Sequence, residues 1–117
     1  MIRVLVVEDS PVVQEFLVHI LGSDPGIEVV GTANNGEEAI QAVEQKRPDV
    51  ITMDIHMPKL NGLDATQRIM ETHPTPIVIV SGSSNVREAA WAFQAMEAGA
   101  VAAVERQIGR ASCRERV

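Results

Sequence analysis

The stretch VITMDIHMP at residues 50–58 places the carboxylate of Asp54 directly after an apolar run of strand length. An acid at the end of a buried strand costs free energy unless it has a partner or a task there. A second apolar run, Ile2–Val7, leads in the same way into Glu8 and Asp9. Two buried strands that each deliver acids at their carboxyl ends predict one acidic cluster, which is the main indication of function.

Apolar runs of strand length alternate with segments of helical period along most of the chain. The runs predicted as strands are Ile2–Val7, 27–32, Val50–Met53, 77–80 and 100–104. The first expected helix is capped by Ser10, and its apolar face comprises Val12, Val13, Phe16, Leu17, Ile20 and Leu21. A second covers 37–46, a third follows a turn at Asn61-Gly62, and a fourth covers about 86–97. This alternation predicts a doubly wound α/β fold with a five-stranded parallel sheet.

Right-handed crossovers bring the carboxyl ends of all the strands to one edge, where such sheets bind ligands. Glu8, Asp9, Asp54 and Ser81 all fall at that predicted edge. Three carboxylates in close proximity repel one another unless a cation neutralises them, and oxygen ligands suit Mg²⁺. We expect Asp9 and Asp54 to bind Mg²⁺ directly, Glu8 to act through water, and the backbone carbonyl of His56 to lie beside them.

A carboxylate next to Mg²⁺ can attack a phosphoryl group, because the metal offsets the repulsion between the two negative groups. Asp54 is the expected nucleophile. Ser81 would contribute a hydroxyl group, and the following Gly82 would let backbone amides approach a phosphoryl oxygen. A cation is expected at the end of the fifth strand, where Arg106 stands.

Several spaced motifs together resemble the receiver domains of two-component response regulators. They are Glu8-Asp9-Ser10, the block MDIHMPKLNG at 53–62, the strand end at Ser81, and Ala98-Gly99-Ala100. The resemblance covers about residues 1–106. The His-Met-Pro block and the stretch THPTPIVIVSG at 72–82 look most like the regulatory domain of chemotaxis protein-glutamate methylesterases.

The resemblance implies a flavodoxin-like sheet with strand order 2-1-3-4-5. It implies that Asp54 accepts phosphate from a sensor histidine kinase, with Mg²⁺ bound by Glu8, Asp9 and Asp54. Ser81 would contact the phosphoryl group, and the switch would act on an output domain that this chain does not contain. The chain would then be a regulatory domain and not itself an enzyme, because methylesterase chemistry requires that separate domain.

Two positions depart from the family's pattern. Arg106 stands where the family has an invariant lysine, with Gln107 in place of the usual proline, and arginine is longer and planar. Ala103 stands where the family has an aromatic switch residue. We therefore keep open a degenerate receiver that acts as an interaction module without phosphorylation. An aspartate-nucleophile phosphatase is the other alternative, but it needs a second aspartate at position 56, which is His56.

The bulk composition limits the domain count and the partners. A chain of 117 residues forms one domain, read here as a receiver domain over 1–106 and an atypical tail, QIGRASCRERV, over 107–117. A net charge of -6 and an aromatic content of 3% argue against nucleic acid, and no apolar run is long enough for a membrane span. The lone Cys113 fits a reducing cytoplasm.

The tail has no sustained apolar stripe, so the final helix of the fold is expected to be missing, truncated or foreign. Loss of that helix would uncover apolar sheet surface, and uncovered apolar surface favours self-association. We predict that light scattering on the purified chain will detect dimers or larger species. A stable, tightly folded monomer would contradict this prediction.

Overall fold

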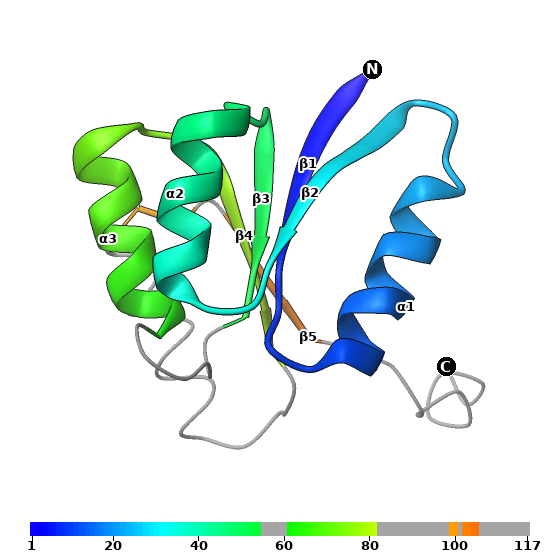
Figure 1. The fold of residues 1–117 in the computed structure, drawn as a ribbon, viewed down its shortest axis with the longest axis horizontal. Helices are drawn as coiled ribbons and strands as arrows, with labels where there is room; N and C mark the ends of the chain where they lie inside the picture. Colours follow the sequence, from blue (N-terminus) through cyan, green and yellow to red (C-terminus); the bar gives the residue numbers. More distant parts are fainter. Residues whose placement is uncertain (55–60, 82–98, 101, 106–117) are drawn as a thin grey trace.

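The computed structural model describes residues 1–54, 61–81, 99–100 and 102–105 (Figure 1). Its elements in chain order are β1 (Ile2–Val7), α1 (Pro11–Gly22), β2 (Ile27–Ala33), α2 (Gly36–Lys46), β3 (Val50–Met53), α3 (Gly62–Thr72), β4 (Ile77–Ser81) and β5 (Ala102–Glu105). Each described strand lies within two residues of its predicted bounds. The helix expected over 86–97 and the tail over 107–117 lie outside the described residues.

The sheet is parallel and has the strand order β2-β1-β3-β4-β5, which confirms the predicted fold and order. The chain extends the sheet from β1 to β2 in one direction and from β3 to β4 and β5 in the other. The order therefore reverses between β1 and β3, and parallel α/β sheets bind ligands beyond the carboxyl ends of the strands at such a reversal. Figure 1 shows the carboxyl ends of these strands at the lower edge of the sheet.

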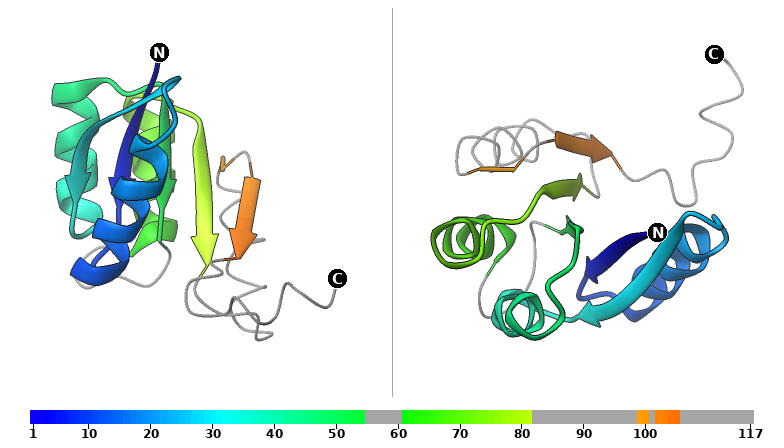
Figure 2. Two further views of the ribbon diagram at one scale, coloured as in Figure 1. Left: turned by 90° about the vertical axis from the view of Figure 1, so that its right-hand side faces the viewer. Right: turned by 90° about the horizontal axis from the view of Figure 1, so that it is seen from above.

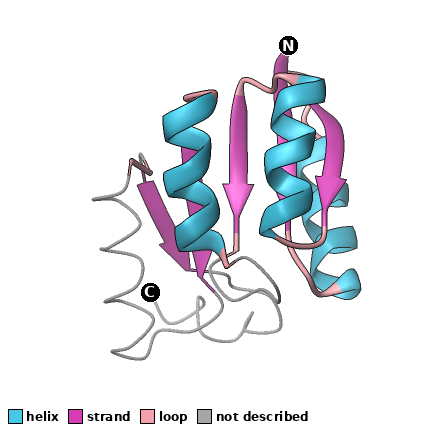
Figure 3. Ribbon diagram, turned by 60° about the vertical axis from the view of Figure 1, so that its left-hand side comes forward, coloured by secondary structure: helices cyan, strands magenta, loops and turns pink. Residues whose placement is uncertain are grey.

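Helices cover both faces of the sheet. Figures 2 and 3 show α2 and α3 side by side on one face and α1 on the other. The core lies between the sheet and the α2–α3 layer. Its largest members are Leu5, Val7, Val43, Ile51, Met53, Ile69, Ile77 and Ile79. Within the part of the chain that the structure describes, no helix combines the length and apolar character needed to cross a membrane.

The apolar face predicted for the first helix divides into two stripes in α1. Val13, Leu17 and Leu21 are half-buried, whereas Val12, Phe16 and Ile20 are 74%, 40% and 46% exposed. Only one of the two stripes of the predicted apolar face is therefore even partly buried. The helix packs mainly on β1 and β2, and only the stripe that faces those strands is shielded from solvent.

Side chains cap three helices at the carboxyl edge of the sheet. Ser10 accepts a hydrogen bond from Val13 N at 3.4 Å and begins α1. Asn35 Oδ1 accepts from Glu38 N at 2.9 Å and begins α2. Asn61, which was expected in a turn, is the N-cap of α3 and accepts a hydrogen bond from the backbone of that helix. Each cap satisfies an amide that the helix itself leaves without a partner.

Gly99 has a backbone conformation that other residues rarely adopt, with φ at +130°. A Cβ atom at this position would lie 2.6 Å from Cγ of Met70 on α3. Such an approach is closer than carbon atoms allow, and Cγ is too near the helix backbone to move away freely. Glycine is therefore required at this position by both its backbone conformation and its packing.

Gly99→Ala is expected to destabilise the domain by about 1–3 kcal/mol, because it combines backbone strain with a steric clash. Gly22→Ala is the matched control, since nothing lies within 4 Å of its Cβ position at the end of α1. That variant should be neutral or more stable by up to about 1 kcal/mol. Urea unfolding of both variants measures the difference, and equal effects would contradict the assignment.

Candidate functional site

Three carboxylates converge at the carboxyl edge of the sheet, where β1 and β3 end. Glu8, Asp9 and Asp54 each offer an oxygen, and these three oxygens lie within 4.8 Å of one another. Glu8 is 1% exposed and Asp54 is 5% exposed, whereas Asp9 is open to solvent. The cluster thus has a buried side formed by two acids and an accessible side formed by the third.

Backbone hydrogen bonds that continue the sheet set the positions of the two buried acids. The Asp54 amide donates to the carbonyl oxygen of Val7 at 3.1 Å, and the Glu8 amide donates to that of Ala33 at 2.9 Å. Each bond extends a strand pairing by one residue beyond the strand end. The backbone amides of the two acids are therefore positioned by the hydrogen bonding of the sheet itself.

Glu8 is also held by its other polar groups. Its Oε2 accepts a hydrogen bond from the Ser10 amide at 3.2 Å, and its carbonyl oxygen accepts one from Nε2 of Gln14 at 2.9 Å. Gln14 was not singled out from the sequence. The available signal was a polar position, four residues after the helix cap, that stands with Glu15 between the apolar pairs Val12-Val13 and Phe16-Leu17 of α1.

The donor set suits a hard divalent cation. At an effective dielectric constant of about 20, two carboxylates within this distance repel by roughly 3 kcal/mol or more, and a cation between them reverses that term. Mg²⁺ takes oxygen ligands, usually only one or two carboxylates, and keeps several waters. A cluster of three acids with one side open to solvent meets these requirements.

The structure locates the remaining predicted site residues only in part. Ser81 is the last residue of β4, and its backbone pairs with Glu105 of β5, so it falls at the same edge of the sheet as the acids. Its side chain is outside the described part of the structure. His56 and Arg106 are also outside the described residues, and their roles stay predictions.

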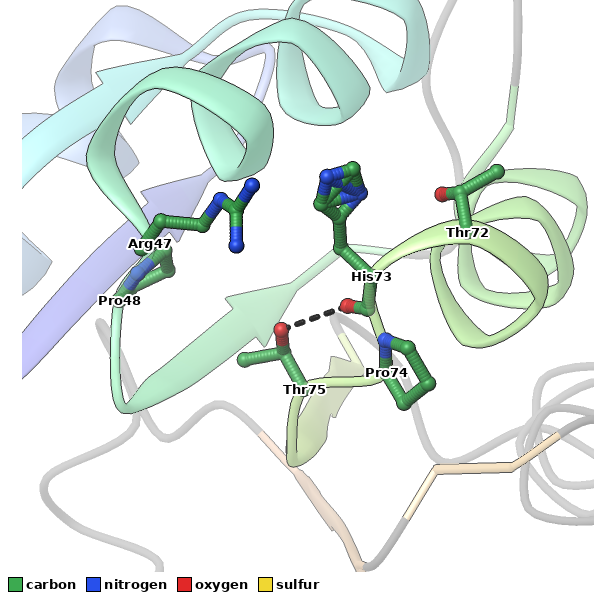
Figure 4. A pocket seen from close by; sticks show the side chains of 6 residues that line it. All are labelled: Arg47, Pro48, Thr72, His73, Pro74 and Thr75. Carbon is green, nitrogen blue, oxygen red and sulfur yellow. Dashed lines mark hydrogen bonds between the residues drawn. The ribbon is translucent and has the colours of Figure 1, made fainter.

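A separate hollow of about 430 Å³ lies at the opposite edge of the sheet, before β3 and β4 begin (Figure 4). It is lined by Arg47, Pro48, Thr72, His73, Pro74 and Thr75. Arg47 follows the end of α2, His73 follows the end of α3, and their side chains face the same space in Figure 4. No member of the acidic cluster lines this hollow, so it is not part of the site at the carboxyl edge.

Comparisons with known proteins agree with this geometry. The family model described as the response regulator receiver domain matches residues 4–117. A protein-glutamate methylesterase/protein-glutamine glutaminase of Nitrosospira multiformis is 66% identical over 109 residues, which are 93% of this chain and 31% of that protein. A protein with the same activities in its name from Geobacter metallireducens is 58% identical over the same share of each chain. The chain thus spans less than a third of these relatives.

Solved structures give the same result. The response regulator domain of Thermotoga maritima CheB is 41% identical with a TM-score of 0.85, over 93% of this chain and 81% of that one. The CheX-CheY-BeF3-Mg²⁺ complex of Borrelia burgdorferi matches at 27% identity with a TM-score of 0.81, over 98% of this chain and 85% of that one.

The likeness to the regulatory domain of methylesterases, predicted from the His-Met-Pro block, is therefore confirmed. The family model covers nearly all of the sequence, including the segment predicted as an atypical tail, although the boundary at 106 itself stays a prediction. On the family model, the relatives and the fold together, this chain belongs to the response regulator receiver domains.

Proposed function

We propose that this domain is a phosphorylation switch in which Asp54 accepts a phosphoryl group from the histidine of a sensor kinase. An Asp54 carboxylate oxygen attacks phosphorus, the phosphorus–nitrogen bond to the kinase imidazole breaks, and an acyl phosphate forms on Asp54. The observation that carries the proposal is the convergence of the Asp54 carboxylate with those of Glu8 and Asp9 within 4.8 Å, at the point where the strand order reverses.

The cluster is suited to hold Mg²⁺ for this reaction. Asp9 and Asp54 would bind the ion directly and Glu8 through water, and the exposure of Asp9 leaves access for the waters that Mg²⁺ keeps. When bound, Mg²⁺ neutralises charge between the attacking carboxylate and the phosphoryl oxygens. In the same proposal, the Ser81 hydroxyl donates to a phosphoryl oxygen and Arg106 supplies the cation at the end of β5.

The names of the relatives suggest the output. We propose that in the full-length protein this receiver controls a methylesterase or glutaminase domain of a cytoplasmic chemotaxis pathway. Phosphorylation replaces the single negative charge of the Asp54 carboxylate with up to two on the phosphoryl group and brings three acceptor oxygens to this edge of the sheet, which reorganises the local hydrogen bonds. A coupling of roughly 1–3 kcal/mol between the phosphorylated edge and the output surface is sufficient for such a switch.

Asp54→Asn is expected to abolish labelling, because the amide removes the nucleophilic oxygen while keeping the size of the side chain. The measurement is incorporation of radioactive phosphate from acetyl phosphate, with and without Mg²⁺. Asp24→Asn is the matched control and should label like the original chain, because its retained Oδ1 can still accept from the Gly26 amide.

Persistent labelling of Asp54→Asn would refute the assignment of the nucleophile. Absence of labelling in the original chain under all conditions would favour the interaction module without phosphorylation. Sustained release of phosphate from small phosphomonoesters would instead support the aspartate-nucleophile phosphatase, which His56 at the position of the second acid argues against.

Asp9→Asn is expected to weaken Mg²⁺ binding by about tenfold or more, because it removes the charge of a direct ligand. Glu8→Gln should weaken binding less, since Glu8 acts through water. Isothermal titration calorimetry with MgCl₂ gives both dissociation constants, and thermal unfolding without Mg²⁺ checks that the variants fold. A larger effect of Glu8→Gln would reverse the proposed roles of the two acids.

A further inference from the structure

The side-chain amide of Gln14, in the first turns of α1, contacts three oxygen atoms from two segments. Its Nε2 lies 2.9 Å from the carbonyl oxygen of Glu8, 3.3 Å from that of Ala33, and 3.1 Å from Oδ1 of Asn34. Figure 1 shows that α1 begins next to the ends of β1 and β2, where these segments leave the sheet. One half-buried side chain thus joins α1 to the ends of both strands.

The chemistry of these neighbours determines the orientation of the amide. Two of the three neighbouring atoms are backbone carbonyl oxygens, which can only accept hydrogen bonds. The amide oxygen of Gln14 in that place would meet acceptors and be repelled. Only the NH₂ group fits there, with one hydrogen for the Glu8 oxygen at the shortest distance and the other shared between Ala33 and Asn34.

Gln14 adds a further restraint on Glu8, the first residue of the acidic loop, which is the segment Glu8-Asp9 that follows β1. The Glu8 amide donates to the Ala33 carbonyl oxygen at 2.9 Å, so Ala33 receives hydrogen bonds both from Glu8 and from Gln14. The Glu8 carbonyl, whose peptide bond leads directly into Asp9, accepts from Gln14. The peptide plane between the two acids is therefore oriented by the amide of Gln14.

The third contact reaches the loop between β2 and α2. The Asn34 amide donates to Oε1 of Glu38 at 2.9 Å, and the neighbouring Asn35 caps α2. Gln14 therefore connects the acidic loop to a segment that is itself anchored to a helix.

We propose that Gln14 is a positioning residue for the metal site, which holds the peptide between Glu8 and Asp9 so that their carboxylates stay converged with that of Asp54. This inference rests on the proposed Mg²⁺ site. Gln14 acts through Glu8 and Asp9 and is not itself a ligand. Loss of its donors frees the peptide between Glu8 and Asp9, and the exposed Asp9 carboxylate, which those of Glu8 and Asp54 repel, then moves away from them in the absence of metal. Mg²⁺ binding must bring them together again, which lowers its affinity.

Gln14→Glu gives a test in which loss of positioning and added negative charge change the Mg²⁺ dissociation constant in opposite directions. The side chain keeps its size but presents a carboxylate to the three oxygens, so the positioning contact is lost. It also adds a negative charge near the cluster, which by itself would strengthen Mg²⁺ binding. We expect the dissociation constant for Mg²⁺ in calorimetry to rise about tenfold, the scale seen for outer partners of metal ligands. Unchanged or tighter binding would overturn the proposal.

Gln45→Glu is the matched control, because it makes the same charge change at an exposed position near the far end of α2. Its Mg²⁺ affinity should equal that of the original chain. Gln14→Met removes the donors without adding charge, and it decides the question if Gln14→Glu does not fold. We expect it to weaken Mg²⁺ binding several-fold and to speed hydrogen exchange at the Glu8 amide.

A purely structural role for Gln14 would lower the unfolding temperature of Gln14→Met but leave the Mg²⁺ affinity of the folded protein unchanged, and that result would refute positioning. Failure of the original chain and of Gln45→Glu to bind Mg²⁺ would refute the proposed metal site together with this inference. Binding by both of these proteins, with no weakening in either Gln14 variant, would refute the role of Gln14 alone.

Discussion

The pairing of β1 with β3 is the constraint on which the site depends. The two strands pair in register from Val4 with Val50 to Val7 with Met53, and the Asp54 amide continues this pairing to the Val7 carbonyl at 3.1 Å. Glu8 directly follows β1, so the register brings acids from distant parts of the sequence side by side. A slip of one residue would exchange the faces of β3 and move Asp54 away from Glu8. The apolar core under α2 and α3 prevents that slip, because it accepts only one face of each strand.

The same edge of the sheet combines rigidity with access to solvent. Ser10, Asn35 and Asn61 cap the three described helices there, and each accepts a hydrogen bond from one amide at the start of its helix. Glu8 is fixed through its amide, its carbonyl and its carboxylate, whereas Asp9 remains exposed. A metal site needs this combination, because ligands must be held in place while waters and the reacting phosphate still have access.

The face of the sheet that α1 covers, opposite α2 and α3, is less completely buried than the core on the other face. On α1, Val12, Phe16 and Ile20 form an exposed apolar stripe within the face that the helical period predicted to be apolar. A hydrophobic period identifies a helix, but the buried fraction of its face depends on which neighbours cover it. Gly99 is a second feature that no local sequence pattern reveals. Glycine is required there because φ is +130° and because Met70 of α3 lies close to the position of a Cβ atom.

The sequence by itself determined the strands, most of the helix starts, the parallel order implied by family resemblance, and the acids that follow β1 and β3. These features are local: a short apolar run defines a buried strand, and a carboxylate directly after it lies at the sheet edge. Only the tertiary structure decided the division of the α1 face, the capping role of Asn61, and the three contacts of Gln14. The Gln14 contacts join residues up to 20 positions apart. Their distances depend on strand register and helix packing, and no local sequence pattern specifies either of these.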